Sequence, residues 1–210
     1  MKKIFPLLLF AVILSSSASA QMFRYGIVGA ANFSTYSMDV DDFDLNTDSR
    51  VGFKAGFRVE MDAPFLLQGF YFDAEATLSS KGAEYTGVNG DAYVNVSSRP
   101  YYLEIPMHMG YHYIFEDSNF GVFGSFGPYF GVGLFGTEKY FIGKEKSNPD
   151  TFSKSNLQRF DFGLGLRAGV SMFDHYRIYV GYDWGLVNVS NVEGVDINNR
   201  NFYIGASYMF

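Results

Sequence analysis

The densest group of potential metal ligands in the sequence is the acidic stretch DVDDFDLNTD at residues 39–48. Calcium prefers oxygen ligands, and this stretch offers the carboxylates of Asp39, Asp41, Asp42, Asp44 and Asp48. The EF-hand pattern is absent, because Thr47 stands at the sixth position counted from Asp42 and Phe53 at the twelfth, where glycine and glutamate are required. We interpret the stretch as a solvated acidic loop, and specific calcium binding stays open as the alternative.

The three histidines do not predict a catalytic or metal site. His108 and His112 are four residues apart in a stretch with strand periodicity, where a rise of about 3.3 Å per residue separates them by roughly 13 Å, too far for one ion. We expect both to form hydrogen bonds inside the protein, and His175 to lie in a short turn. Because no serine, histidine and aspartate set is visible around them, the sequence predicts neither an enzyme nor a cofactor.

Two further features argue against nucleotides and nucleic acids as partners. Residues 131–136, GVGLFG, formally match G-x-G-x-x-G, but a nucleotide-binding loop must connect a strand to a helix, and this motif lies inside a predicted strand. The chain has 16 basic and 22 acidic residues, a net charge of −6, whereas a nucleic-acid partner requires a basic surface.

The elements that carry these residues are predicted to be strands. Apolar and polar residues alternate with a period of two in eight segments, at 23–35, 51–61, 66–80, 99–113, 120–136, 160–172, 177–188 and 201–210. Most are longer than the five or six residues usual in soluble sheets and match the roughly 9–11 residues of a transmembrane strand. Residues 118–137 carry no charge, but their many glycines and Pro128 favour a strand over a membrane helix.

The segments outside these strands predict export and an alternation of short and long connections. Lys2 and Lys3, the apolar run at 4–14 and the small residues at 18–20 are typical of a cleaved signal peptide, residues 1–20. The mature domain is then 21–210. Short connections are expected near 62–65, 115–119 and 173–176, and long ones near 36–50, 81–98, 137–158 and 189–200. Asn89-Gly90 predicts a tight hairpin, so the third and fourth strands should project beyond the membrane.

The residues opposite the apolar face decide between a membrane barrel and a soluble one. A secreted carrier of an apolar ligand would have its apolar face inside, whereas a membrane barrel has it outside, against lipid. Repeated glycines on the polar face favour a narrow, filled lumen, because glycine weakens a strand and has no use on a solvated face. The predicted lumen holds four cations, six carboxylates and several tyrosines, namely Arg24, Lys54, Arg58 and Arg167, Glu60, Asp73, Glu75, Glu104, Asp161 and Asp183, and Tyr71, Tyr102, Tyr129 and Tyr179.

Several motifs resemble the small outer-membrane β-barrel proteins of the "porin family": LSSKGAEY (78–85), YYLEIPMHMGY (101–111), FGPYFGVGL (126–134), FDFGLGLRAGV (160–170) and the C-terminal strand. The resemblance covers nearly all of the mature chain. It implies an all-β fold, an eight-stranded antiparallel up-and-down transmembrane barrel, in the outer membrane of a Gram-negative cell. It also implies that outer-membrane lipid is a partner and that the closing strand, which ends at Phe210, is read by the barrel-assembly machinery.

We expect a structural or surface-interaction role through long extracellular loops. Tyr140, Phe141 and Phe152 in the third loop are candidates to touch a partner or lipid headgroups. The alternatives are a narrow porin-like channel for small solutes, a secreted soluble carrier, and a lipid-modifying enzyme, for which no catalytic set is visible.

Overall fold

The computed structural model describes residues 23–40, 43–46, 48–89, 92–142, 145–147, 150–153, 156–192 and 194–210. The predicted signal peptide, residues 1–20, lies outside the described residues and stays a prediction. The strands are β1 (Phe23–Val40), β2 (Phe43–Asn46), β3 (Asp48–Asp62), β4 (Phe70–Ser80), β5 (Ala83–Asn89), β6 (Ala92–Ile114), β7 (Phe120–Ile142), β8 (Glu145–Ser147), β9 (Phe160–Met172), β10 (Tyr176–Gly185) and β11 (Val195–Met209).

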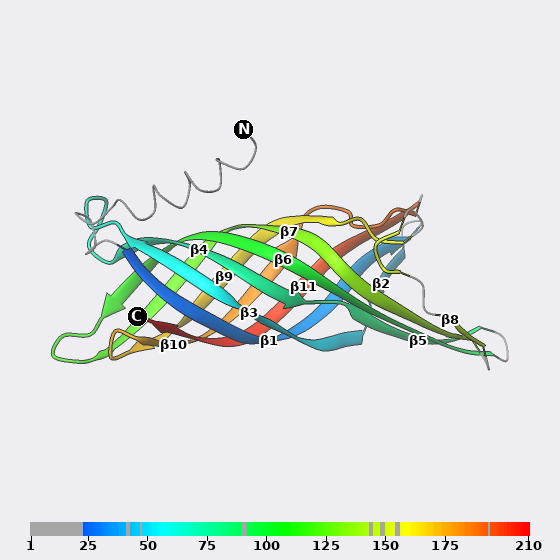
Figure 1. Cartoon of the computed structure of the whole chain (residues 1–210), viewed down its shortest axis with the longest axis horizontal. Coiled ribbons are helices and arrows are strands. Elements are labelled where there is room, and N and C mark those ends of the chain that lie inside the picture. Colours follow the sequence, from blue (N-terminus) through cyan, green and yellow to red (C-terminus); the bar gives the residue numbers. More distant parts are fainter. Residues whose placement is uncertain are drawn as a thin grey trace, which may run out of the picture.

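Eight of these strands close into a ring (Figure 1). Each pairs in an antiparallel manner with its neighbours in the chain, in the order β1, β3, β4, β6, β7, β9, β10 and β11, and β11 returns to pair with β1. The prediction of an eight-stranded up-and-down barrel is therefore confirmed. The described residues contain no helix that is long and apolar enough to cross a membrane.

The apolar face of the strands points outward, as predicted. Phe57 exposes 71% of its surface, whereas its neighbour Arg58 exposes 1%, because successive side chains of a strand point to opposite faces. The predicted face of β7 is likewise exposed, from Phe120 and Val122 to Leu134. A continuous apolar outer surface around a polar interior is the arrangement of a membrane barrel.

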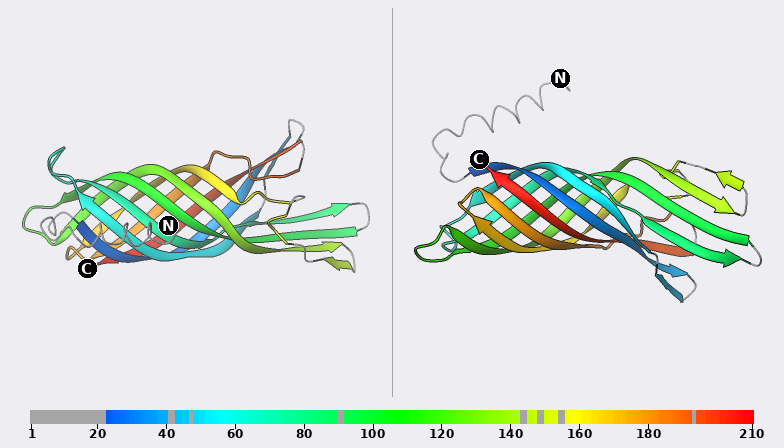
Figure 2. Two further views of the ribbon diagram at one scale, coloured as in Figure 1. Left: turned by 45° about the horizontal axis from the view of Figure 1, so that its top comes forward. Right: turned by 90° about the horizontal axis from the view of Figure 1, so that it is seen from below.

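The two ends of the barrel differ. The short connections, at 63–69, 115–119 and 173–175, lie at the end that holds the C-terminus, and we call it the short-turn end. At the other end, the long-loop end, β5 and β8 extend together with the parts of β6 and β7 that they pair with beyond the rest of the barrel (Figure 2). The predicted extended hairpin is therefore confirmed, with Asn89 of β5 paired to Ala92 of β6.

Several strand boundaries differ from the sequence prediction. Most strands run further into the long connections than expected; β7, for example, continues to Ile142. Conversely, β4 begins at Phe70 rather than at residue 66, because residues 63–69 form a wide turn in which Gly69 adopts a left-handed φ of 88°. The apolar tip of that turn, Phe65 to Leu67, is exposed. Its apolar residues wrongly indicated that the strand begins at residue 66.

Candidate functional site

The barrel interior holds two groups of ion pairs that fill its middle. Six basic side chains meet six buried carboxylates, where the sequence predicted four basic side chains. The additional ones are Lys81 and Arg177. Both could have been found from the alternation, because Lys81 continues the series Asp73, Glu75, Thr77 and Ser79 on β4, and Arg177 shares its face with Asp183 on β10. The expected excess of carboxylates was therefore wrong.

The group nearer the long loops, which we call the long-loop cluster, consists of Lys54, Lys81, Glu104, Asp161 and Asp183. The Lys54 ammonium lies 3.2 Å from Glu104 and 3.2 Å from Asp183. Lys81 contacts Glu104 and lies 3.3 Å from Asp161. Glu104 thus connects both lysines, and the five residues come from β3, β6, β9 and β10 and the segment that follows β4.

The short-turn cluster consists of Arg24, Arg58, Arg167, Arg177, Glu60, Asp73 and Glu75. Arg58 donates to Asp73 at 2.9 Å and to Glu60 at 3.1 Å, and Arg167 lies 2.9 Å from Glu75. Arg177 donates to Glu60, with one bond at 2.7 Å. Arg24, which is partly exposed at the rim, contacts Glu60 as well as Asp62. Each buried carboxylate of this cluster therefore faces at least one guanidinium group.

Tyrosine rings occupy the space between the ion pairs. The Lys54 ammonium lies 4.5 Å from the centre of the Tyr203 ring, and the Arg167 guanidinium lies 5.1 Å from that of Tyr179. A cation over an aromatic face is attracted by the ring. Glycines make this packing possible: a side-chain carbon at Gly181 would lie 2.2 Å from the Tyr203 ring. The inference that lumen glycines leave room for large side chains is therefore confirmed.

The three histidines differ in their hydrogen-bond partners. The His112 ring nitrogen lies 2.6 Å from the Ser171 hydroxyl, a hydrogen bond as expected. His108 is also buried in the lumen, but neither of its ring nitrogens has a hydrogen-bond partner in the described part of the chain, so that expectation was wrong for His108. His175 lies in the turn between β9 and β10 and bonds the carbonyl of Met209 at 2.7 Å.

Apolar side chains close the long-loop end above the ion pairs. This mouth cluster consists of Tyr36, Ala83, Tyr102, Phe152, Leu157 and Val189, with Met38 and Ile197 packed against it. Phe152 exposes only 8% of its surface and its ring lies 5.6 Å from that of Tyr102. The expectation that Phe152 touches an outside partner was therefore wrong, because the loop folds back into the mouth. The side chains of Tyr140 and Phe141 lie outside the described part.

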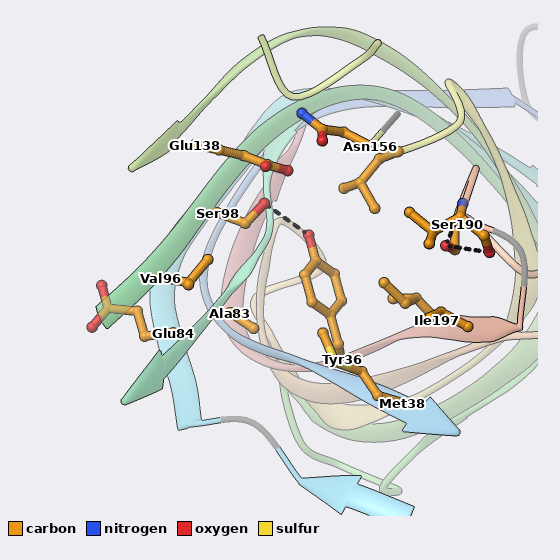
Figure 3. A pocket seen from close by; sticks show the side chains of 13 residues that line it. Tyr36, Met38, Ala83, Glu84, Val96, Ser98, Glu138, Asn156, Ser190 and Ile197 are labelled. Carbon is orange, nitrogen blue, oxygen red and sulfur yellow. Dashed lines mark hydrogen bonds between the residues drawn. The ribbon is translucent and has the colours of Figure 1, made fainter. Parts of the chain in front are cut away.

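The mouth cluster does not fill its space and leaves a cavity of about 170 Å³ (Figure 3). One side of the cavity is polar: the Tyr36 hydroxyl lies 3.3 Å from the Ser98 hydroxyl, and Glu138 and Asn156 lie above them. The other side is apolar, with Met38, Leu157, Val192, Val195 and Ile197.

The remaining candidates carry no site in the described residues. The side chains of Asp39, Asp41, Asp42 and Asp44 lie outside the described part, and Asp48 is exposed at the start of β3. Within the described residues, no group of three potential ligands can hold a metal ion. The GVGLFG motif lies inside β7, as predicted, with no helix after it.

The charged side chains of the interior are arranged so that they fill the lumen. Charged groups away from water are stable only when they are paired, and here the pairs connect strands on opposite sides of the barrel. An eight-stranded barrel has an interior just wide enough for side chains. The two clusters and the tyrosines occupy that width.

A comparison with protein families agrees with the barrel fold. The family described as "Outer membrane protein beta-barrel domain" matches residues 15–191. The chain belongs to this family. It is therefore an outer-membrane β-barrel protein, and the family implies the outer membrane of a Gram-negative cell. The family is defined by a membrane barrel rather than by an enzymatic activity.

Solved structures of small outer-membrane barrels are similar to the chain at low sequence identity. OprG from Pseudomonas aeruginosa is 13% identical, with a TM-score of 0.47, and the match covers 90% of this chain and 96% of OprG. The Neisserial surface protein NspA is 13% identical, with a TM-score of 0.42 and coverage of 89% and 97%. Ail from Yersinia pestis is 12% identical, with a TM-score of 0.41 and coverage of 89% and 99%. No curated protein matches the sequence.

Proposed function

We propose that this protein is a closed outer-membrane barrel that acts at the cell surface through its long-loop end. The observation that carries the proposal is the filled interior: the long-loop and short-turn clusters bridge the strands, and the side chains of Arg58, Arg167 and Glu104 are at most 1% exposed. A pathway for solutes would require these pairs to separate, which costs several kcal/mol for each unpaired buried ion.

The two ends support the choice of the long-loop end as the acting surface. The short connections have little chain beyond the barrel, whereas β5, β8 and the paired parts of β6 and β7 extend well past it (Figure 2). In bacterial outer-membrane barrels the short turns face the periplasm and the longer loops face outward. The extended end therefore offers the surface that an outside partner would meet.

Cysteine labelling in intact cells tests the orientation that this function requires. The chain contains no cysteine, so a single introduced thiol reports its own position. Asp48→Cys, exposed at the long-loop end, should react with a membrane-impermeant maleimide, and Glu116→Cys, exposed in a short turn, should react only after the outer membrane is permeabilised. The reverse pattern would contradict the proposal.

A further inference from the structure

The outer face of the barrel has an apolar hollow near the short-turn end, over β3, β4 and β6. Its volume is about 460 Å³, and larger apolar side chains surround Ala74 in it, namely Val59, Met61, Phe72, Met107 and Met109. The strand register explains the hollow. Val59, Ala74 and Met107 lie side by side on the three strands, and the small side chain of Ala74 leaves the space between its larger neighbours.

The hollow opens toward the membrane rather than toward the lumen. Val59, Met107 and Met109 are exposed on the outer face of the barrel. Asp73 and His108 also border the hollow, but their side chains belong to the lumen and are at most 4% exposed. Among the described residues that line the hollow, all side chains that are not buried are therefore apolar.

The turn at residues 63–69 continues this apolar surface beyond the strands. It joins β3 to β4 directly after Met61 and before Phe72, which both line the hollow. At its tip, Phe65–Leu67 expose between 58% and 68% of their surface. The Gly69 carbonyl accepts a hydrogen bond from the backbone N–H of His112 at 2.8 Å, which fixes the turn to β6. The tip is thus held in place with its apolar side chains exposed.

The shape of this surface favours a lipid chain over a second barrel. Two barrels are both convex, so they meet along a narrow line and leave a hollow between them unfilled. An acyl chain is thin and flexible, and methionine side chains adapt to irregular shapes. From Ala74 to Phe70, where β4 begins, the strand covers about 13 Å. This length is comparable with the hydrocarbon thickness of one leaflet, about 15 Å.

We propose that the hollow binds one acyl chain of a phospholipid from the leaflet at the short-turn end. The chain lies over Ala74, between Phe72 and Met107, and the tip of the turn, Phe65–Leu67, covers the end of the chain that carries the headgroup. The surface role proposed above is independent of this site. The orientation of the barrel decides only which leaflet supplies the lipid.

Palmitoyl-oleoyl phosphatidylethanolamine is a suitable probe, added to the purified, refolded chain in detergent micelles. The chain is labelled with ¹³C at its methionine methyl groups. Met107 and Met109 line the hollow, whereas Met172 lies half-buried on β9, outside it. The lipid should shift the Met107 and Met109 signals in a saturable manner and leave the Met172 signal unchanged. The single-chain lysophospholipid with the same headgroup should bind with similar affinity, because only one chain occupies the hollow.

Two pairs of variants separate the hollow from general lipid contact. Ala74→Phe fills the hollow and should weaken binding at least about tenfold, since the burial of only two methylene groups corresponds to more than that factor. Ala168→Phe makes the same change at an exposed position on β9 and should leave the affinity unchanged. Phe65→Ser should weaken binding, and Phe173→Ser, at an exposed position of another short turn, should not.

Three results would overturn the inference. The first is equal affinity in Ala74→Phe and Ala168→Phe, or in Phe65→Ser and Phe173→Ser if Ala74→Phe does not fold. The second is an equal response of Met172 and Met107 to the lipid. The third is a Met107 shift that follows protein concentration together with the appearance of a dimer, which would assign the hollow to a second copy of the chain. Because these measurements use isolated protein, their failure leaves the cell-surface orientation to be judged by the labelling experiment.

Discussion

The middle of the barrel is filled by charged side chains, whereas the long-loop mouth is filled by apolar ones. In the middle, Arg58, Arg167 and Glu60 stand on strands whose ladder fixes their height and direction. In the mouth, Phe152, Leu157 and Val189 come from irregular segments that fold inward over the barrel. Among the described residues of the two ion-pair clusters, every buried ion has an opposite charge beside it, whereas the apolar region leaves a cavity.

This difference shows how one small barrel can be tightly paired in its middle and loosely packed at its mouth. Electrostatic pairing in a poorly solvated interior demands a partner for each charge, so the middle tolerates little change. Apolar contacts have no direction, so the mouth can pack loosely and retain a cavity. The two ion-pair clusters, which we together call the plug, and the mouth cavity therefore lie in different parts of the lumen.

The largest expected effect is the loss of one cation from the middle. Arg167→Met removes the guanidinium that faces Glu75 and Asp73, and an uncompensated buried charge costs about 3–5 kcal/mol. Urea unfolding of the barrel in lipid vesicles measures this loss of unfolding free energy. Arg99→Met, at an exposed position on β6, is the matched control and should change stability by no more than about 0.5 kcal/mol. Equal stabilities of the two variants would show that the ion pairs do not hold the plug.

A charge on the outer face should have the next largest effect. Leu166 is exposed on β9, next in the chain to Arg167, and Leu166→Arg places a guanidinium in lipid, at a cost of about 2–4 kcal/mol near mid-membrane. The volume-conserving Leu166→Met should cost under about 1.5 kcal/mol. Unfolding in vesicles compares the two variants, and a Leu166→Arg protein as stable as Leu166→Met would reverse the assignment of the faces.

A change in the mouth should be milder and independent of the plug. Phe152→Leu keeps an apolar side chain against Tyr102 and should cost less than about 1.5 kcal/mol. Phe152 shares no ion pair or ring contact with Arg167 among the described residues, so the double variant should lose the sum of the single losses within about 0.5 kcal/mol. A larger coupling, measured by the same unfolding experiment, would mean that plug and mouth form one unit.

Much of the barrel can be predicted from the alternation of apolar and polar residues alone, because a period of two shows which side chains share a face of the sheet. Phe57 and Arg58 were placed correctly for this reason, and so were the lumen tyrosines. Alternation does not state which residues meet across the lumen. Lys54 and Asp183, for example, are 129 positions apart and face each other only through the barrel closure. The charged residues of the lumen were therefore predicted as one set, without Lys81 and Arg177, and not as pairs.

The errors arose where strands end or lose their regularity. Lys81 lies just beyond β4, where the alternation was assumed to stop. The register of β6 and β7 shifts between Tyr101 and Tyr102, so Leu134 and Phe135 are both exposed. Phe152 follows no periodic pattern, and its burial depends on how a whole loop folds into the mouth. The cavity beside it had no sequence signal, because its lining comes from several separate segments.

Single-channel recording from the purified, refolded chain in a planar bilayer shows directly whether the paired charges close the lumen. We expect no stable open state for the unmodified barrel, because the long-loop and short-turn clusters leave no continuous path for solutes. A steady, ion-selective current from the unmodified protein, with a selectivity that changes in Lys54→Met, would contradict the account and favour a narrow channel.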